Sequence, residues 1–327
     1  MVKVVYEGMT YEIAKEESLL DGLLNHQVEV PFGCKSGTCQ SCLLKCTEGD
    51  IPSQAQKGLR ESQKMLQLFL ACQCYPASNM QVVRPASEAD AIPATVEDLR
   101  PLNSEIIEVS LKPAQDFTFL AGQFIRLFNP EGIGRPYSLA SVHGVDPLLK
   151  LHVREYPQGK LSHWIHHELS IGDQVEISQP MGECFYLPGK SEQSLLMIGT
   201  GSGLAPLYGI LRDALQQGHQ GPIHLYHGAR TIQGLYLQDE LKLLMAQHPQ
   251  LHYQACVSDP KMALPSGVMR GRASEIALAA HPNLKNWGVF LCGNPEMVRA
   301  TQMQAFLADA ELNEVHADPF DAQSSVS

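Results

Sequence analysis

The sequence predicts a multidomain protein that combines α+β and α/β domains along a chain of 327 residues. Three observations lead to this class. Cysteines cluster near the N-terminus, apolar and polar residues alternate through the middle as in antiparallel strands, and strands alternate with helices in the last third. At roughly 150 residues per domain, the length fits two or three domains.

Composition narrows the class of protein. Hydrophobic residues make up 44% and charged residues 18% of the chain, and the net charge is -11 at pH 7. This negative charge argues against nucleic acid or an anionic membrane as a partner. No apolar run approaches the ~18 residues of a membrane-spanning helix, and the N-terminus lacks the apolar core of a signal peptide. We therefore expect a cytoplasmic protein whose nine cysteines are ligands or buried thiols rather than disulfides.

The strongest motif is the cysteine cluster. Cys34 and Cys39 are separated by four residues, Cys39 and Cys42 by two, and Cys72 follows after residues 43–71. This C-x4-C-x2-C…C spacing is typical of plant-type [2Fe–2S] sites, whereas zinc sites usually pair two C-x2-C knuckles. Small residues in the loop would let its backbone wrap closely around a cluster; they are Gly33, Ser36, Gly37 and Thr38.

The segments VPFGCKSGTCQSC and LACQCYP resemble plant-type ferredoxins and the ferredoxin domains of bacterial oxygenase reductases. The resemblance implies a β-grasp domain and places the fourth cluster ligand at Cys72, with Cys74 as the alternative. Cys74 and Cys46 are then expected to be buried side chains. The stretch 17–26 predicts a short helix with one leucine-rich face. The implied metal ligands are Cys34, Cys39, Cys42 and Cys72.

The middle of the chain carries a second motif. An Ala- and Pro-rich stretch, 84–94, predicts a linker, and residues 95–127 alternate like strands of a barrel. GRPYSLAS follows and resembles the flavin motif of the ferredoxin–NAD(P)H reductase family. The resemblance implies that Arg135 binds a phosphate, Tyr137 lies against the flavin ring, and Ser138, as a catalytic residue, lies near the hydride-accepting nitrogen.

LHVREYPQGKLSHWIHH predicts a strand, a turn and a helix that begins near Ser162. In the same family this region sets backbone N–H groups at a helix start against the FAD pyrophosphate, where the helix dipole favours anions. A pyrophosphate cradle favours FAD over FMN. The matching residues are Arg154, Gly159, Lys160, Leu161 and Ser162.

Three histidines in this helix, His163, His166 and His167, raise the question of a metal site. The pattern is not H-E-x-x-H, and the sequence indicates no matching acidic or cysteine ligand nearby. We therefore interpret them as a solvated helix face. The stretch 171–188 is expected to supply the last strands of the barrel, with Cys184 packed in the interior.

SLLMIGTGSGLAPLYGILRDAL predicts a strand, a glycine turn and a helix. Its G-x-G-x-G spacing differs from the usual G-x-G-x-x-G, yet it leaves a turn that a dinucleotide pyrophosphate can approach. Alternating strands and helices predict a doubly wound parallel sheet. GTGSGLAP resembles the nicotinamide-nucleotide motif of the same reductases, so the expected cofactor-binding residues are Gly199, Thr200, Gly201, Ser202, Gly203 and Pro206.

A later strand ends in LCGNP, which matches the family's C-G-x-P motif. The resemblance implies that Cys292 lies beside the reacting nicotinamide carbon, as a second catalytic residue, and that Gly293 shapes the turn; the alternative is a buried structural thiol. No acidic residue ends the second strand to favour NADH. Arg230 stands there and could bind the 2′-phosphate of NADPH, but GART also resembles NADH-dependent reductases, so we favour NADH with NADPH possible.

The order and length of these parts resemble the reductase components of bacterial multicomponent oxygenases. The resemblance implies a [2Fe–2S] ferredoxin domain at 1–88, an FAD-binding barrel at 89–188, an NAD(P)H-binding domain at 189–320 and a disordered tail at 321–327. The expected function is hydride transfer from NADH to FAD, then single electrons through the cluster to an oxygenase or a ferredoxin-type acceptor protein. The oxygenase would attack an aromatic or other small organic substrate. Alternatives are a reductase serving a deoxysugar dehydratase and a redox-sensing electron carrier.

Overall fold

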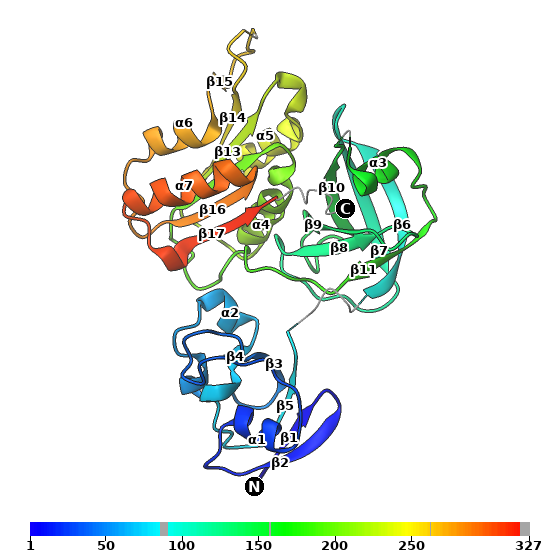
Figure 1. Cartoon of the computed structure of the whole chain (residues 1–327). Coiled ribbons are helices and arrows are strands. Elements are labelled where there is room, and N and C mark those ends of the chain that lie inside the picture. The colour runs from blue at the N-terminus through cyan, green and yellow to red at the C-terminus, as the bar shows by residue number, and fades with distance from the viewer. Residues whose placement is uncertain (86–90, 157, 262, 321–327) are drawn as a thin grey trace. The chain divides into compact units, whose positions relative to one another are not determined.

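The structure is a computed structural model that describes residues 1–85, 91–156, 158–261 and 263–320 (Figure 1). The chain divides into two compact units, Met1–Ser87 and Glu88–Ser327. Within the described ranges, the helices are all too short or too polar to cross a membrane. The tail predicted at 321–327 lies outside the described residues.

The first unit is a five-stranded sheet in the order β2-β1-β5-β3-β4, crossed by a short helix. β1 is parallel to β5, and the other neighbours are antiparallel. This mixed sheet with its helix confirms the expected β-grasp fold. The elements are β1 (Val2–Tyr6), β2 (Met9–Ile13), α1 (Leu19–Asn25), β3 (Leu43–Glu48), α2 (Glu61–Met65), β4 (Leu68–Leu70) and β5 (Met80–Val83).

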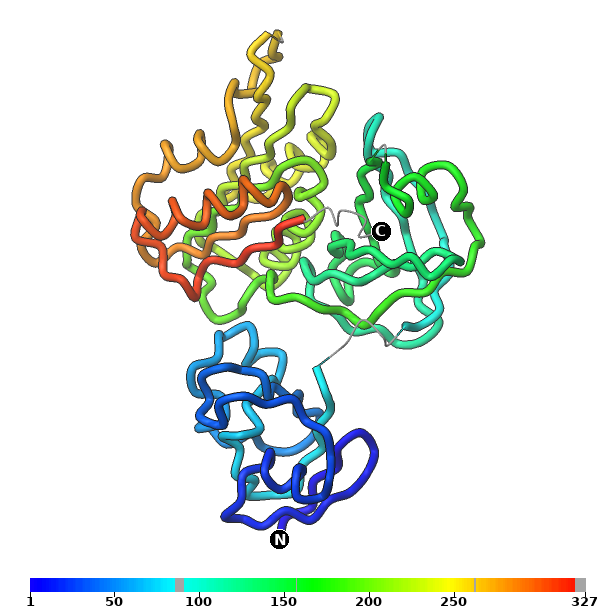
Figure 2. The backbone as a smooth tube through the Cα atoms, viewed as in Figure 1, coloured from blue at the N-terminus to red at the C-terminus, as the bar shows by residue number. Residues whose placement is uncertain are grey.

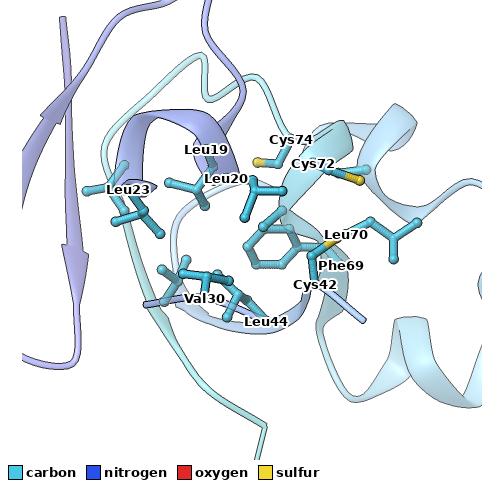
Figure 3. Close-up of a cluster of buried hydrophobic side chains, with 14 of the residues drawn as sticks. Leu19, Leu20, Leu23, Val30, Cys42, Leu44, Phe69, Leu70, Cys72 and Cys74 are labelled. Carbon is cyan, nitrogen blue, oxygen red and sulfur yellow. The ribbon is translucent and has the colours of Figure 1, made fainter. Parts of the chain in front are cut away.

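Helix α1 forms where the sequence predicts it. The Ser18 side chain caps the helix by accepting the Asp21 N–H at 3.1 Å. Three leucines on one face of α1 gather around Phe69 (Figure 3); they are Leu19, Leu20 and Leu23, each fully buried. Burying one such side chain stabilises the fold by roughly 1.5–3 kcal/mol. The core therefore lies between α1 and the sheet, which leaves the cysteine loop at its edge.

The second unit begins with a six-stranded antiparallel sheet in the order β10-β7-β6-β11-β8-β9. A bridge from Leu139 to Leu151 joins the two edges, and the Ala140 N–H donates to the Lys150 carbonyl at 2.9 Å. The sheet thus closes into the expected barrel. Its elements are β6 (Ala91–Pro101), β7 (Ile106–Pro113), β8 (Phe124–Phe128), β9 (Gly134–Ser138), β10 (Leu149–Arg154), α3 (Lys160–His167) and β11 (Gln174–Ser178).

Two boundaries in the barrel differ from the sequence prediction. The linker expected to reach residue 94 ends earlier, because β6 starts at Ala91 and buries Ile92 and Ala94 on alternate positions. The stretch 171–188 supplies one strand, β11, rather than several. Pro180 has no N–H to donate, and Gly182, with φ of 97°, turns the chain after a single bridge between Met181 and Phe124.

The rest of the unit is a six-stranded parallel sheet in the order β15-β14-β13-β12-β16-β17. Leu195 and Met197 pack with α4 and α5 on one face, and Leu196 and Ile198 pack with α6 and α7 on the other. Figure 2 follows the backbone through these layers. This is the predicted doubly wound fold. Its elements are β12 (Leu195–Thr200), α4 (Leu204–Gln216), β13 (Ile223–Ala229), α5 (Gln238–Gln247), β14 (Leu251–Val257), β15 (Val268–Arg270), α6 (Ala273–Ala280), β16 (Gly288–Gly293), α7 (Pro295–Leu307) and β17 (Val315–Pro319).

Helix α4 packs against the barrel. The Arg212 guanidinium forms a bidentate ion pair with Asp146, at 2.7 and 3.2 Å, and both side chains are largely buried. A Cβ at Gly209 would lie 2.9 Å from the Leu139 carbonyl oxygen, so glycine is needed for this close approach. These contacts therefore hold the barrel against the parallel sheet near β12, where the order of the strands reverses.

Two histidines of the parallel sheet, His224 and His227, have pKa values lowered by burial. The His224 ring stacks on His252 with centroids 4.8 Å apart and lies 4.3 Å from the centroid of His281. Burial, helped by His281 and His252, lowers the pKa of His224 to about 4. Burial also lowers the pKa of His227 to about 4. In the unfolded chain these histidines have the usual pKa of about 6.5. Between about pH 4 and pH 6.5 the unfolded chain therefore binds more protons than the folded chain.

We predict that the second unit loses stability progressively as the pH falls from about 6.5 towards 4, because unfolding takes up protons in that range. Thermal unfolding measured across this range should show the loss. His224→Asn should flatten the pH dependence, whereas His143→Asn, at an exposed histidine of the same unit, should leave it unchanged. An equal slope in His224→Asn and the unaltered protein would contradict this assignment.

Candidate functional site

The structure arranges the four predicted cluster ligands as two pairs. Cys34 and Cys39 are exposed, and each donates its backbone N–H to the sulfur of the other, at 3.4 and 3.3 Å. Cys42 and Cys72 are buried, and burial together with the neighbouring Cys72 raises the pKa of Cys42. A [2Fe–2S] cluster takes four thiolates on two irons, so two pairs are the arrangement it requires.

The exposed pair is prepared for ligation by its loop. Hydrogen bonds from the Ser36 side chain and from the backbone N–H groups of Cys39 and Ser36 lower the pKa of Cys34 to about 5. A hydrogen bond from the Ser41 side chain contributes most to lowering the pKa of Cys39. A low pKa favours the thiolate, which is the form that binds metal. The donor set therefore fits an iron–sulfur cluster.

The surroundings of Cys72 and Cys74 differ. The Gln73 amide donates to the Lys35 carbonyl in the loop at 3.3 Å and to the Cys72 sulfur at 3.7 Å. The Cys74 carbonyl accepts the Leu19 N–H at 2.7 Å, which ties it to α1 (Figure 3). Burial raises the pKa of Cys74 to about 12. These contacts support Cys72 as the fourth ligand and Cys74 as a core residue.

The predicted flavin motif lies on β9. The Arg135 side chain donates to the Gly134 carbonyl at 2.8 Å, and Tyr137 is half-buried, with a pKa raised by desolvation. Ser138 is buried, and its hydroxyl donates to an Asp318 carboxylate oxygen at 2.6 Å. This bond joins the barrel to the last strand of the parallel sheet and fixes the orientation of the Ser138 hydroxyl.

The second flavin segment starts helix α3 at Lys160, with Gly159 as its N-cap and no side chain capping the first-turn N–H groups. The Ser162 hydroxyl instead donates to the Gly159 carbonyl at 3.3 Å and accepts the Tyr156 N–H at 3.1 Å. The Leu161 side chain is buried in the barrel core, so its backbone alone can face a ligand. The start of α3 therefore offers N–H groups suited to an anion.

Arg154 links this segment to the nucleotide motif. Its guanidinium pairs with Glu105 at 2.8 Å, and a Cβ at Gly201 would lie 3.5 Å from its Nη1. A basic side chain from the flavin segment thus lies beside the glycine turn of the parallel sheet. Pro206 occupies the third position of α4, within the first turn where its missing N–H costs nothing.

The glycine turn after β12 contacts the turn after β16. A Cβ at Gly203 would lie 2.3 Å from the Cys292 carbonyl oxygen, and one at Gly293 would lie 2.6 Å from the Thr200 carbonyl oxygen. Gly293 also has a φ of 114°, which L side chains rarely adopt. The Asn294 N–H donates to the Thr200 hydroxyl at 3.0 Å. This edge, where strand order reverses, is where doubly wound sheets bind their ligands.

Cys292 lies at this edge in β16 and is fully buried, which raises its pKa well above the ordinary value. Its sulfur lies 3.8 Å from that of Cys184, so Cys184 is buried as expected but contacts the site as well. Asp318 stands opposite Cys292 in the register of β17, and burial raises the pKa of its carboxyl. The structure therefore assembles Ser138, Asp318 and Cys292 at one point.

Two further residues lie at the same edge. Arg230 is exposed after β13, and its carbonyl accepts the Asp259 N–H at 3.0 Å. The Phe320 N–H donates to the Gly293 carbonyl at 2.8 Å, which places the residue directly after β17 at the turn.

One expectation from the sequence is wrong, namely that the α3 histidines lack an acidic partner, whereas the exposure of His163 and His167 agrees with the expected solvated helix face. The histidines of α3 have an acidic partner: Glu155 bonds to His163 at 3.2 Å and to His167 at 2.6 Å. Glu155 follows β10, and the connection to α3 returns the chain so that the helix faces this carboxylate. Residue spacing along the chain does not indicate this contact.

Family models match three consecutive stretches of the chain. The 2Fe-2S iron-sulfur cluster binding domain matches residues 3–77, the oxidoreductase FAD-binding domain matches 99–186, and the oxidoreductase NAD-binding domain matches 197–303. The protein is accordingly an NAD(P)H-dependent iron–sulfur flavoprotein oxidoreductase. The predicted cofactors, a [2Fe–2S] cluster, FAD and a nicotinamide nucleotide, are confirmed by these matches.

Relatives and solved structures extend the similarity over nearly the whole chain. A ferredoxin–NAD(P)+ reductase component of naphthalene 1,2-dioxygenase/salicylate 5-hydroxylase systems from Ralstonia sp is 30% identical, covering 98% of both chains. The reductase subunit of an aromatic O-demethylase from Amycolatopsis sp. (strain ATCC 39116 / 75iv2) is 32% identical over 90% of both chains. The crystal structure of the Amycolatopsis cytochrome P450 reductase GcoB is 28% identical, with a TM-score of 0.69, over 99% of this chain and 100% of that one. The chain therefore belongs to the family of iron–sulfur flavoprotein reductases that serve as the reductase components of oxygenase systems.

Proposed function

We propose that this protein passes electrons from NADH to a cytoplasmic partner oxygenase that attacks an aromatic or other small organic substrate. The observation that carries the hydride-transfer part is the meeting of Ser138, Asp318 and Cys292 beside the glycine turn. The aromatic substrate is supported by relatives that serve naphthalene and salicylate oxygenases and an aromatic O-demethylase. The partner is expected to dock near the exposed cysteine loop.

In this proposal, the residues of the site bind the cofactors, and the cofactors carry the electrons. When bound, FAD accepts two electrons as hydride from the nicotinamide, and the [2Fe–2S] cluster accepts electrons one at a time. Arg135 and the N–H groups at the start of α3 supply positive charge for the FAD phosphates, and Tyr137 offers a flat face for the flavin ring. The glycine turn after β12 leaves room for the nucleotide pyrophosphate.

The hydroxyl of Ser138 has a defined role in this proposal. Because its O–H donates to Asp318, its oxygen lone pairs would be available to accept the N–H that the hydride-accepting nitrogen of the flavin gains on reduction. Asp318 is then a positioning residue, and its raised pKa reflects its enclosure rather than contact with the nucleotide. Cys292, fully buried behind the turn, shapes the floor on which the nicotinamide would lie.

The test of this function is anaerobic stopped-flow reduction of the purified holoprotein with NADH and, separately, with NADPH. We expect loss of flavin absorbance followed by the spectral change of the cluster, and faster flavin reduction with NADH. A reduced flavin with an unchanged cluster spectrum would show that electrons do not pass between the two. Faster reduction by NADPH would overturn the nucleotide assignment.

Serine variants of Cys72 and Cys74 test which of these two cysteines binds the cluster. Cys72→Ser should lose the [2Fe–2S] absorbance and iron content, because Cys72 completes the buried pair with Cys42. Cys74→Ser should keep both, because Cys74 lies against α1 in the core. The measurements are visible spectroscopy and iron analysis, with FAD content as the internal reference. Retention of the cluster in Cys72→Ser would reject this ligand set.

Replacement of Ser138 tests the hydride step. Ser138→Ala should slow flavin reduction by NADH by about tenfold to a hundredfold, since one hydrogen bond to a charged or developing-charge group contributes about 1.5–3 kcal/mol. FAD content should stay unchanged. Ser110→Ala, at a buried serine of β7, is the matched control and should reduce at the normal rate. A normal rate in Ser138→Ala would remove Ser138 from the chemistry.

A further inference from the structure

Three side chains outside the redox site converge on the surface of the barrel: Glu155, His163 and His167. Glu155 directly follows β10, where its N–H donates to the Glu105 carbonyl at 2.8 Å, so its backbone is held in place. His163 and His167 are four residues apart in α3 and therefore share one face of the helix. The three residues come from the two elements that flank the β10–α3 connection.

Their ligand atoms are close enough for one cation. A single Glu155 oxygen lies 3.2 Å from His163 Nδ1 and 2.6 Å from His167 Nε2. In the part of the chain that the structure describes, this is the one group of three such side chains whose ligand atoms all lie within 4.8 Å of one another. Zinc bonds of about 2.1 Å in a tetrahedron separate ligand atoms by about 3.4 Å, so shifts under about 1 Å admit the ion.

We propose that Glu155, His163 and His167 bind one divalent transition-metal cation of the zinc class, with solvent completing its coordination. Two imidazole nitrogens and one carboxylate oxygen form a donor set suited to zinc and its neighbours, whereas magnesium and calcium prefer oxygen alone. The site uses residues other than the cysteine ligands and the flavin and nucleotide motif residues, although Glu155 directly follows Arg154 and His163 directly follows Ser162 of the flavin segment.

An ion pair alone accounts poorly for this convergence. Exposed pairs of this kind contribute only about 0–1 kcal/mol. If both histidines were protonated, their positive rings would lie with centroids 4.3 Å apart on a single carboxylate oxygen. A divalent cation between the three side chains would bind both imidazoles in their neutral form and so remove that repulsion. His167 also lies in the last turn of α3, where the helix dipole favours a cation.

The site is accessible to solvent, and the same helix contains a third histidine that can serve as a control. The His163 and His167 side chains are 55% and 50% exposed, so a cation can reach them without opening the barrel. His166, in the same helix, instead bonds through Nε2 to the Val153 carbonyl at 3.0 Å, and its ring lies 6.3 Å from that of His167. His166 is therefore outside the donor set.

The experiment is calorimetric titration of the holoprotein, carrying both FAD and the cluster, with zinc chloride. Bound cluster keeps the cysteine thiols from competing. We expect the unaltered protein and His166→Gln to bind the same number of zinc ions, and His163→Gln/His167→Gln to bind one fewer or to bind that ion at least tenfold more weakly. Thermal unfolding should show a zinc-dependent rise in Tm for the first two proteins that the double variant lacks.

Glu155→Gln tests the carboxylate separately. It keeps both histidines but should weaken zinc binding at least tenfold, because an amide oxygen is a poorer ligand than a carboxylate. Equal zinc stoichiometry and affinity in the unaltered protein and the double histidine variant would overturn the site. Equal affinity in Glu155→Gln would overturn the three-ligand set, and a matching loss in His166→Gln would show that the effect is not specific to these residues.

Discussion

The redox site depends on the contact between the turns after β12 and β16. With any side chain at position 203, its Cβ would lie 2.3 Å from the Cys292 carbonyl oxygen, which no real contact allows. Glycine therefore lets two parallel strands end against each other. That contact fixes Cys292 and, through the pairing of β16 with β17, places Asp318 beside it.

Contacts between the barrel and the parallel-sheet domain also position Ser138 at this site. Ser138 donates to Asp318, 180 positions later in the sequence, and the Arg212–Asp146 ion pair also joins α4 to the barrel. A buried ion pair of this kind adds little net stability but defines one arrangement, since either partner alone would be an uncompensated charge. Reaction geometry is thus set by packing, and a displacement of about 1 Å can cost a hundredfold in rate.

The cysteine site depends on a different constraint. Its exposed pair has hydrogen bonds that favour the thiolate, whereas burial raises the pKa of Cys42 to about 11 and so disfavours its thiolate without metal. Binding of the cluster must therefore displace a proton from Cys42. Because metal binding and deprotonation are linked, the buried pair should make cluster retention weaken as the pH falls. Because Cys34 and Cys39 are exposed and Cys42 and Cys72 are buried, a cluster held by the four would have one side open to a partner.

The sequence predicted those features whose motifs lie within a short stretch of the chain. The cysteine spacing, the flavin motif and the glycine turn are local, so both the fold class and the cofactors followed from them. Asp318 and Glu155 carry no local signature. Asp318 gains its role from strand register, and Glu155 lies only eight positions from His163 yet meets it through a connection whose path no spacing rule describes. Single polar residues in a strand or directly after one are therefore where the structure adds most to the sequence, because strand register and the path of the chain decide which distant side chains they contact.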